Sequence, residues 1–421
     1  MTLAVRRTFR ALRHRNYRLF FAGQGVSMIG TWLQQVAMGW LAYRLTGSAL
    51  LLGVIAFCAN AGVLFLGSFA GVIADRVDRR RAMFATQGLM AAQAVLLATV
   101  TALDVVQPWH LIGLALWMGL VNAFDIPLRQ SLYVHFVDDR HDLPNAIALN
   151  SFLVNAARVI GPALAGVLLA VTTEAVCFAL NAASFVAVFV ALARMRFPKH
   201  EVRGEVRGLR ESWVEGFRYV TRFAPARALL ALSATVSFTI MPYAPLMPVY
   251  AKDVLQGGPQ ALGALLSAAG AGALACTVYL ARRESIVGLG RVIVAAAIAS
   301  GIALAVFGQV RWMPLALALM VVAGGGVILA AAASNTILQT IVTDDLRGRV
   351  AGFYTLSFLG VAPLGNLAAG AMAQRFGVPA TFLVNGIACV AIALWFLRGL
   401  PRLKAAIRPV YVQLGLLPPE E

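Results

Sequence analysis

Long apolar runs fill most of the chain, and polar residues collect in short breaks between them. A run of about 18 apolar residues or more can cross a hydrocarbon core of about 30 Å as a helix. Twelve runs fit this description, at residues 17–43, 48–74, 82–103, 109–129, 143–170, 176–193, 227–249, 260–281, 292–309, 313–337, 350–372 and 379–397. The pattern therefore predicts an all-α polytopic membrane protein with 12 transmembrane helices.

Composition supports this class, and charge predicts the orientation. Of the 421 residues, 60% are hydrophobic and 13% charged, whereas a soluble chain carries about a quarter charged residues. The net charge is +17, but the basic residues do not form one patch of the kind that binds nucleic acid. With a cytoplasmic N-terminus, 30 of the 35 Lys and Arg residues fall on the cytoplasmic side and four on the opposite side. This bias predicts a bacterial cytoplasmic (inner) membrane protein with both termini in the cytoplasm, and no nucleic-acid partner.

Residues that catalyse reactions or bind metals are scattered. The four cysteines each stand alone inside a span, and the five histidines lack the spacing of metal ligands. The chain has no HExxH motif and no GxxxxGK(S/T) loop. We therefore expect no metal, no cofactor and no enzymatic activity, which disfavours a membrane-embedded enzyme and an ATP-driven pump.

The chain divides into two similar halves around a polar segment. Gly161–Gly166 in the fifth span resembles Gly365–Gly370 in the eleventh. The segment between the halves contains a short amphipathic helix with Trp213, Phe217 and Val220 on one face. Parallel repeats of this kind are typical of transporters that rock around a midplane site. The expected organisation is a six-helix bundle at 1–193, a cytoplasmic linker at 194–226, a second six-helix bundle at 227–398 and a cytoplasmic tail at 399–421.

A charged loop follows the second span, in the sequence GVIADRVDRRR from Gly71 to Arg81. Its pattern resembles the loop signature G-x-x-x-D-R-x-G-R-R of the major facilitator superfamily. The matching residues are Gly71, Asp75, Arg76, Arg79 and Arg80, and Asp78 stands where the family has Gly. The resemblance implies a latch on the cytoplasmic side, in which Asp75 faces the start of the eleventh helix and Arg79 pairs with Asp125.

Further stretches resemble the drug/proton-antiporter-like branch that includes the enterobactin exporter and macrolide-efflux relatives. They lie at residues 16–20, 40–48, 143–150, 155–162 and 338–349. Gly161, Pro162 and Gly166 partly match the fifth-helix signature associated with exporters in this family. The alternative is an ordinary packing kink, since Pro removes a helix hydrogen bond and Gly permits close packing.

Two charged residues within spans are candidate functional residues. Arg158 shares a helix face with Ser151, Asn155 and Pro162, and it either attracts an anionic or polar substrate group or contacts carbonyls where Pro162 disturbs the helix. Asp125 is the one carboxylate placed within a span. It is either the latch partner of Arg79 or a proton carrier, and its place near the cytoplasmic boundary favours the latch.

The remaining candidate residues are polar or aromatic side chains within spans, and we expect them to line a substrate cavity. They are Gln24, Thr31 and Gln35 in the first span, Phe238, Met241 and Tyr243 in the seventh, Asn335 in the tenth, and Tyr354 and Phe358 in the eleventh. Each aromatic residue alone is more often a packing residue than a ligand contact.

These observations predict a monomeric secondary transporter that exports a small amphiphile, drug-like or siderophore-like, by alternating access. Uptake or lipid movement by the same fold is the alternative. Proton coupling follows from the resemblance, but the residues support it weakly if the latch occupies Asp125.

Overall fold

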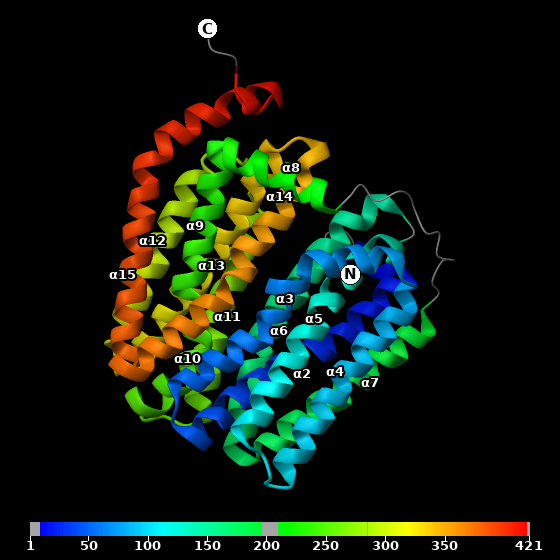
Figure 1. The fold of residues 1–421 in the computed structure, drawn as a ribbon, viewed down its shortest axis with the longest axis vertical. Helices are drawn as coiled ribbons and strands as arrows, with labels where there is room; N and C mark the ends of the chain where they lie inside the picture. Colours follow the sequence, from blue (N-terminus) through cyan, green and yellow to red (C-terminus); the bar gives the residue numbers. More distant parts are fainter. Residues whose placement is uncertain (1–8, 138, 196–208, 284, 419–421) are drawn as a thin grey trace. The chain divides into compact units, whose positions relative to one another are not determined.

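The computed structural model describes residues 9–137, 139–195, 209–283 and 285–418 (Figure 1). Every regular element in these ranges is helical. Contacts divide the chain into two compact units. Unit 1 contains Met1–Arg203 and Pro245–Ala271, and unit 2 contains Gly204–Ala244 and Gly272–Glu421. The second stretch of unit 1 belongs by sequence to the seventh and eighth predicted spans. The predicted bundle and linker boundaries remain predictions.

Unit 1 is built on six long helices. They are α2 (Arg15–Thr46), α3 (Ala49–Arg76), α4 (Arg79–Ala102), α5 (Pro108–Phe136), α6 (Leu143–Val171) and α7 (Glu174–Arg194). Short 3₁₀ turns, η1 (Arg10–Arg13) and η2 (Arg140–Asp142), precede α2 and α6. Helix α3 packs on α5, and α2 packs on α6 and α7. At the α3–α5 crossing, a Cβ on Gly62 would overlap the carbonyl of Gly119, so glycine lets the two backbones touch.

The rest of unit 1 is a short segment with an irregular backbone. Most of α10 (Tyr243–Val249), the π-helix η3 (Tyr250–Val254) and the first half of α11 (Pro259–Ala281) belong to it. Pro245 and Pro248 interrupt the helical hydrogen bonds here, because proline has no N–H to donate.

Unit 2 packs α9 (Ala224–Ile240), α12 (Leu289–Phe307), α13 (Met313–Ile341) and α15 (Ala362–Gln413) against one another. Its other elements are α8 (Leu209–Arg222), α14 (Asp344–Thr355) and the π-helix η4 (Leu356–Gly360). Gly377, with φ of 81°, breaks α15 into two helices. Glycine adopts this left-handed conformation without steric cost, and Pro379 restarts the helix two residues later.

Ten helical segments of the described residues are long and apolar enough to cross a membrane, compared with the twelve predicted spans. Two differences account for the count. The segment Leu346–Gln413 contains two predicted spans joined at Gly377. Helix α2 is long enough, but Gln24, Gln34 and Gln35 lower its hydropathy. The spans are otherwise found near the predicted bounds, and the all-α membrane fold is confirmed.

The predicted amphipathic helix of the linker is α8, and it packs on α14. A Cβ on Gly216 would lie 2.9 Å from the Phe353 ring, so the glycine allows close approach. Glu215 pairs with Arg349 at 2.6 Å, from an Oε2 to an Nη1 atom. The apolar face is divided, because Val220 is buried and Phe217 is 50% exposed. The side chain of Trp213 lies outside the described residues.

Candidate functional site

The loop signature forms the junction between α3 and α4. Asp78 is the N-cap of α4, and its carboxylate accepts the backbone N–H of Arg81 at 3.0 Å. This explains the aspartate at the family's glycine position, because a short acidic side chain satisfies a free N–H of the first helical turn. The guanidinium of Arg80 lies over the Phe84 ring at 5.9 Å. The surroundings of Gly71 and the side chains of Asp75 and Arg76 lie outside what the structure describes.

Asp125 lies fully buried on α5, within a cluster of donors. Its Oδ1 accepts Thr86 Oγ1 at 2.8 Å and Gln87 Nε2 at 2.7 Å, both from α4. Its Oδ2 lies 2.7 Å from Arg129 Nε, one helical turn farther along α5. The carboxylate thus has partners on both α4 and α5. The pairing with Arg79 remains a prediction.

A second polar group in unit 1 connects four helices. Gln34 of α2 donates to Gln93 Oε1 of α4 at 3.0 Å, and Asn181 of α7 donates to Gln34 Oε1 at 2.8 Å. Gln93 in turn donates to the Leu114 carbonyl of α5 at 3.2 Å. Sequence reasoning missed this group. It chose Gln35 instead, which the structure places on an exposed position of α2.

The predicted cavity face of α6 lies against α2. The Arg158 guanidinium stands over the Trp32 ring at 5.3 Å, a cation–π contact that neither predicted role anticipated. Asn155 is buried and donates to the Ser151 carbonyl of its own helix at 2.9 Å. A Cβ on Gly161 would overlap the Cβ of Trp32, so glycine at this position is needed for the contact between α6 and α2.

The two predicted cavity residues of α2 differ in their bonding. Thr31 donates to the Ser27 carbonyl at 2.9 Å and is half-buried. Gln24 is 4% exposed, and its Oε1 has no hydrogen-bond partner among the described residues. An unpaired buried amide oxygen costs stability, and functional sites often keep such groups. Gln24 therefore remains a candidate for contact with a polar ligand group.

The other face of α6 packs against α11 through backbone atoms. A Cβ on Gly263 would lie 2.8 Å from the Gly166 Cα, and one on Gly270 would lie 2.8 Å from the Arg158 carbonyl oxygen. Between these glycines, Ser267 donates to the Val159 carbonyl at 2.8 Å. Gly166 of the predicted exporter signature is thus a packing residue. Pro162 lies in the same stretch of α6, and a bend there remains a prediction.

The C-terminal end of α2 has polar contacts that the sequence did not indicate. Tyr43 donates a short hydrogen bond to Asp253 of η3, and the Lys252 ammonium lies 5.4 Å from the Tyr43 ring centre. The next residue, Arg44, pairs with Glu174 of α7 through Nε and Oε1 at 2.8 Å. These contacts connect α2 with η3 and with α7 at one end of unit 1.

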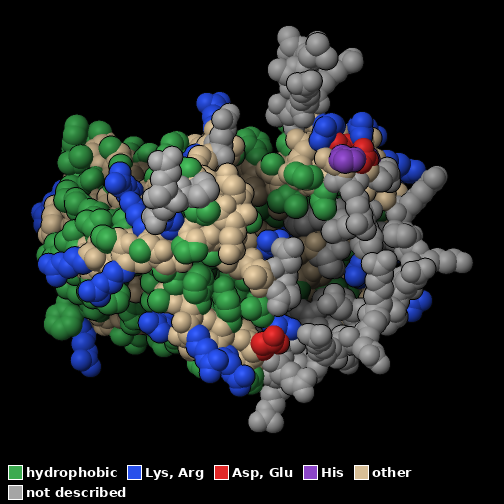
Figure 2. All heavy atoms as spheres, turned by 90° about the horizontal axis from the view of Figure 1, so that it is seen from above, with side chains coloured by type: hydrophobic (Ala, Val, Ile, Leu, Met, Phe, Trp, Pro, Cys, Tyr) green, Lys and Arg blue, Asp and Glu red, His purple; other side chains and the backbone are tan. Residues whose placement is uncertain are grey.

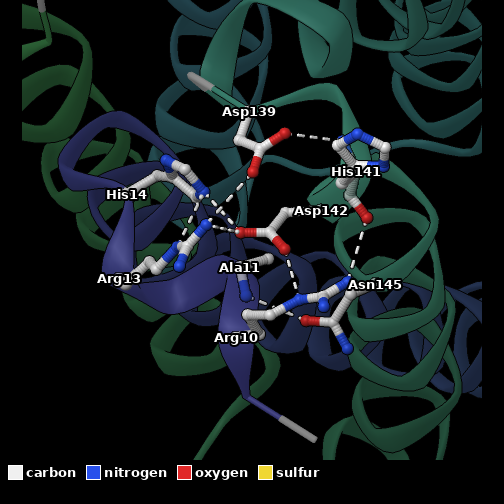
Figure 3. A network of polar contacts seen from close by, with 8 residues as sticks. All are labelled: Arg10, Ala11, Arg13, His14, Asp139, His141, Asp142 and Asn145. Carbon is white, nitrogen blue, oxygen red and sulfur yellow. Dashed lines mark hydrogen bonds and ion pairs between the residues drawn. The ribbon is translucent and has the colours of Figure 1, made fainter. Parts of the chain in front are cut away.

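The N-terminal end of α2 carries a second cluster, shown in Figure 3. Asp142 is 1% exposed and lies 2.8 Å from both His14 Nε2 and Arg13 Nη2, and it also contacts Arg10. Burial alone would raise the pKa of Asp142, but the His14 contact and the two guanidinium charges hold this pKa below its ordinary value. The cluster ties the segment before α2 to the start of α6.

The aromatic candidates in unit 2 surround the π-helix η4. Tyr354 donates to the Ala331 carbonyl of α13 at 2.8 Å and stacks on Phe358 with ring centres 6.2 Å apart. Ser237 of α9 donates a short hydrogen bond to the Phe358 carbonyl. Asn335 lies one turn beyond Ala331 on α13 and accepts from Gln339 at 3.5 Å. Single π-helical turns inside helices are frequent at functional sites.

The three candidates in the seventh predicted span are placed differently from one another. Phe238 is 38% exposed, and a Cβ on Gly365 of α15 would collide with its backbone carbonyl. Met241 is half-buried, whereas Tyr243 is 9% exposed. The structure thus brings Phe238, Tyr354 and Phe358 around η4, whose neighbours are α9 and α14.

Comparison with known proteins assigns this arrangement to a family. Residues 6–411 match the family model described as transmembrane secretion effector. The staphyloferrin A transporter of Staphylococcus aureus (strain NCTC 8325 / PS 47) is 26% identical, over 90% of this chain and 95% of the relative. The multidrug efflux pump Tap of Mycobacterium tuberculosis (strain ATCC 25618 / H37Rv) is 28% identical, over 91% of each chain. The crystal structure of the nucleoside transporter NupG (D323A mutant) matches with a TM-score of 0.69 at 14% identity, over 92% of this chain and 99% of that chain.

Proposed function

Because the chain belongs to the transmembrane secretion effector family of the major facilitator superfamily, we propose that it exports a small amphiphilic compound by alternating access. It is a multi-pass membrane protein that transports small molecules. Two relatives, a staphyloferrin A transporter and a multidrug efflux pump, support siderophore-like or drug-like substrates. Uptake is the alternative direction of transport, and a lipid is the alternative cargo.

The observation that best supports alternating access is that residues 245–271 pack within unit 1. These residues belong by sequence to the seventh and eighth spans, yet they contact α6 through Gly263, Ser267 and Gly270. They also contact α2 through the hydrogen bond from Tyr43 to Asp253. Contacts between backbones separate as rigid surfaces, because they interlock few long side chains. We infer that this interface closes the outer end of the pathway and that it opens when the cytoplasmic latch closes.

Each unit holds candidate substrate contacts of its own. In unit 1, Gln24 and Asn155 provide buried polar groups, and the Arg158 guanidinium lies over the Trp32 ring. In unit 2, Tyr354 and Phe358 provide a stacked aromatic pair. Both kinds of group suit an amphiphile, because aromatic surface supplies affinity and a few polar groups fix orientation.

Transport into inverted membrane vesicles tests direction, cargo and coupling together. The panel should contain a carboxylate siderophore, a macrolide, a cationic dye and a fluorescent phospholipid, each with and without a pH gradient. Accumulation of a drug or siderophore in inverted vesicles supports export. Accumulation only in right-side-out vesicles would contradict it, and movement of the phospholipid alone would indicate a lipid mover.

Arg158→Ala, compared with Arg158→Lys, separates a substrate-binding role of this arginine from a structural role. If the guanidinium attracts substrate anions, transport of anionic compounds falls more than transport of neutral ones, and Lys rescues part of the loss. An equal loss for both classes, with no rescue by Lys, would indicate that Arg158 serves packing on Trp32.

A further inference from the structure

A cavity of about 490 Å³ lies in unit 2, between the start of α12 and the last turns of α15. Its walls are mainly apolar, and Ile286, Ile337, Leu403 and Ile407 are among the lining residues. Ligand pockets of roughly 300–1,000 Å³ hold drug-sized molecules, so the space suits part of an amphiphile. It lies apart from the residues around η4 that the proposed transport function uses.

The polar residues lining the cavity are basic. Arg291, Lys404 and Arg408 line it. Behind the lining residue Gly288, Arg283 donates from Nη2 to the Val287 carbonyl at 2.8 Å, which adds a fourth guanidinium or ammonium group beside the cavity. No acidic residue belongs to the lining in the described part of the chain. The sequence has Glu284 in the same loop, outside the described residues.

The helix that forms one wall is amphipathic. Residues 400–413 of α15, called the tail helix below, bury Leu400, Leu403, Ile407 and Tyr411 at helical spacing. Lys404 lies on an exposed position between them. A basic amphipathic helix that continues a membrane span is typical of segments that lie at an anionic membrane surface.

Neighbouring residues also place this end of α15 at the level of the lipid headgroups. Trp395 is 67% exposed, and it lines a second groove together with Arg398 and Arg402. Exposed tryptophan beside arginine is the composition of a membrane–water interface. Figure 2, which looks onto the end where the C-terminus lies in Figure 1, shows Lys and Arg side chains spread over this face.

We propose that this cavity binds an anionic phospholipid, with the phosphate held by Arg291, Lys404 and Arg408 and the start of an acyl chain against Ile286 and Ile407. A phospholipid would use both features of the cavity, because the cations attract its phosphate and the apolar walls pack against its hydrocarbon chain. The bound lipid would hold the tail helix against α12. This binding does not depend on the direction or cargo of transport.

Native mass spectrometry of the purified full-length protein tests the proposal with three probes, namely cardiolipin, phosphatidylcholine and inorganic phosphate. The variant Arg291→Gln/Lys404→Gln removes two cavity charges. Arg218→Gln/Arg222→Gln is the matched control, because it removes two exposed charges of α8 that line a separate groove. Melting temperature and size-exclusion profile check that both variants remain folded.

We expect tight binding of cardiolipin to the parent protein and to the control, and weak binding of phosphatidylcholine. The cavity variant should lose affinity for cardiolipin about 25-fold, since each basic residue near an anionic lipid surface contributes about 1 kcal/mol and 1.4 kcal/mol is a factor of ten. Equal binding of both lipids, or equal losses in the two variants, would overturn the proposal and indicate only annular lipid.

A third variant, Ile286→Ser, tests the apolar wall without changing charge. Because Ile286 is only half-buried in a loop, the substitution is compatible with folding. It should weaken cardiolipin binding and leave any phosphate binding unchanged. Complete displacement of cardiolipin by millimolar phosphate, with no effect of Ile286→Ser, would show a simple anion site and overturn the assignment of a lipid.

Discussion

The close contact between α6 and α11 gives the sharpest test of the gating proposal. A Cβ added at Gly263 would lie 2.8 Å from the Gly166 Cα and 2.5 Å from the Pro162 carbonyl oxygen. Both atoms belong to the backbone of α6 and cannot rotate away. Gly263→Ala therefore forces α6 and α11 apart wherever they touch, and has no such effect in a state where they are separated.

Two contributions determine the size of this shift in the conformational equilibrium. Alanine in place of glycine stabilises a helix by about 1 kcal/mol in either state, so this gain cancels between the two conformations. Overpacking costs about 1–3 kcal/mol and acts only on the closed interface. Since 1.4 kcal/mol is a factor of ten, the equilibrium should shift toward the separated state by roughly 5- to 150-fold.

Thiol labelling measures this shift at Ser267, whose hydroxyl donates to the Val159 carbonyl at 2.8 Å inside the interface. In a background without the native cysteines, Ser267→Cys reports opening through its rate of reaction with a maleimide. Gly263→Ala should raise this rate and slow transport. The matched control is Gly113→Ala, because a Cβ on Gly113 of α5 would have no atom within 4 Å.

Two results would refute the reasoning. Unchanged labelling and unchanged transport in Gly263→Ala would mean that this interface does not open during the cycle. Equal increases in Gly263→Ala and Gly113→Ala would mean that labelling reports general loosening of the fold, and a lower melting temperature of both variants would accompany it.

Three further substitutions test single contacts. Asp125→Asn removes the buried carboxylate, and it should leave pH-driven transport intact while shifting the balance between inward-open and outward-open states. If transport instead no longer depends on the pH gradient and this balance is unchanged, Asp125 is the proton carrier. Tyr43→Phe removes the donor to Asp253 and should raise maleimide labelling of Ser267→Cys several-fold, and an unchanged rate would remove this bond from the gate. Asp142→Asn should lower the melting temperature at pH 7. Because folding lowers the pKa of Asp142, the parent's higher melting temperature should persist above about pH 4, and the difference from the variant should decrease below that pH. A difference in melting temperature that stays constant down to about pH 3 would contradict this.

The helical fold could be predicted because the hydrophobic effect acts along each span separately. Apolar length alone located most spans, and the charge pattern located the loops. The sequence was least informative at α2, where Gln24, Gln34 and Gln35 reduce the apolar signal. Breaks that depend on backbone conformation, such as Gly377 and the two π-helices, leave only weak traces in hydropathy.

The candidate site was predicted less well, because helix phase decides which neighbour of a pair faces inward. Gln34 and Gln35 differ by about 100° around α2, and composition cannot choose between them. The structure buries Gln34 at 1% exposure within the polar group of unit 1 and exposes Gln35. Contacts between residues distant in sequence were also invisible, such as Tyr43 with Asp253, which lie 210 positions apart.

The carboxylates of unit 1 bear directly on where a proton could couple to transport. Asp125, Asp142 and Glu174 are all buried, and each contacts at least one arginine. Asp253 differs, since it accepts a hydrogen bond from the neutral phenol of Tyr43 and lies on an exposed position of η3. Of these four carboxylates, Asp253 is the one that lies open to solvent, from which a proton can reach it directly. If transport is proton-coupled, Asp253→Asn should therefore remove its dependence on the pH gradient while Asp125→Asn keeps it, and the reverse pattern in vesicles would return the role to Asp125.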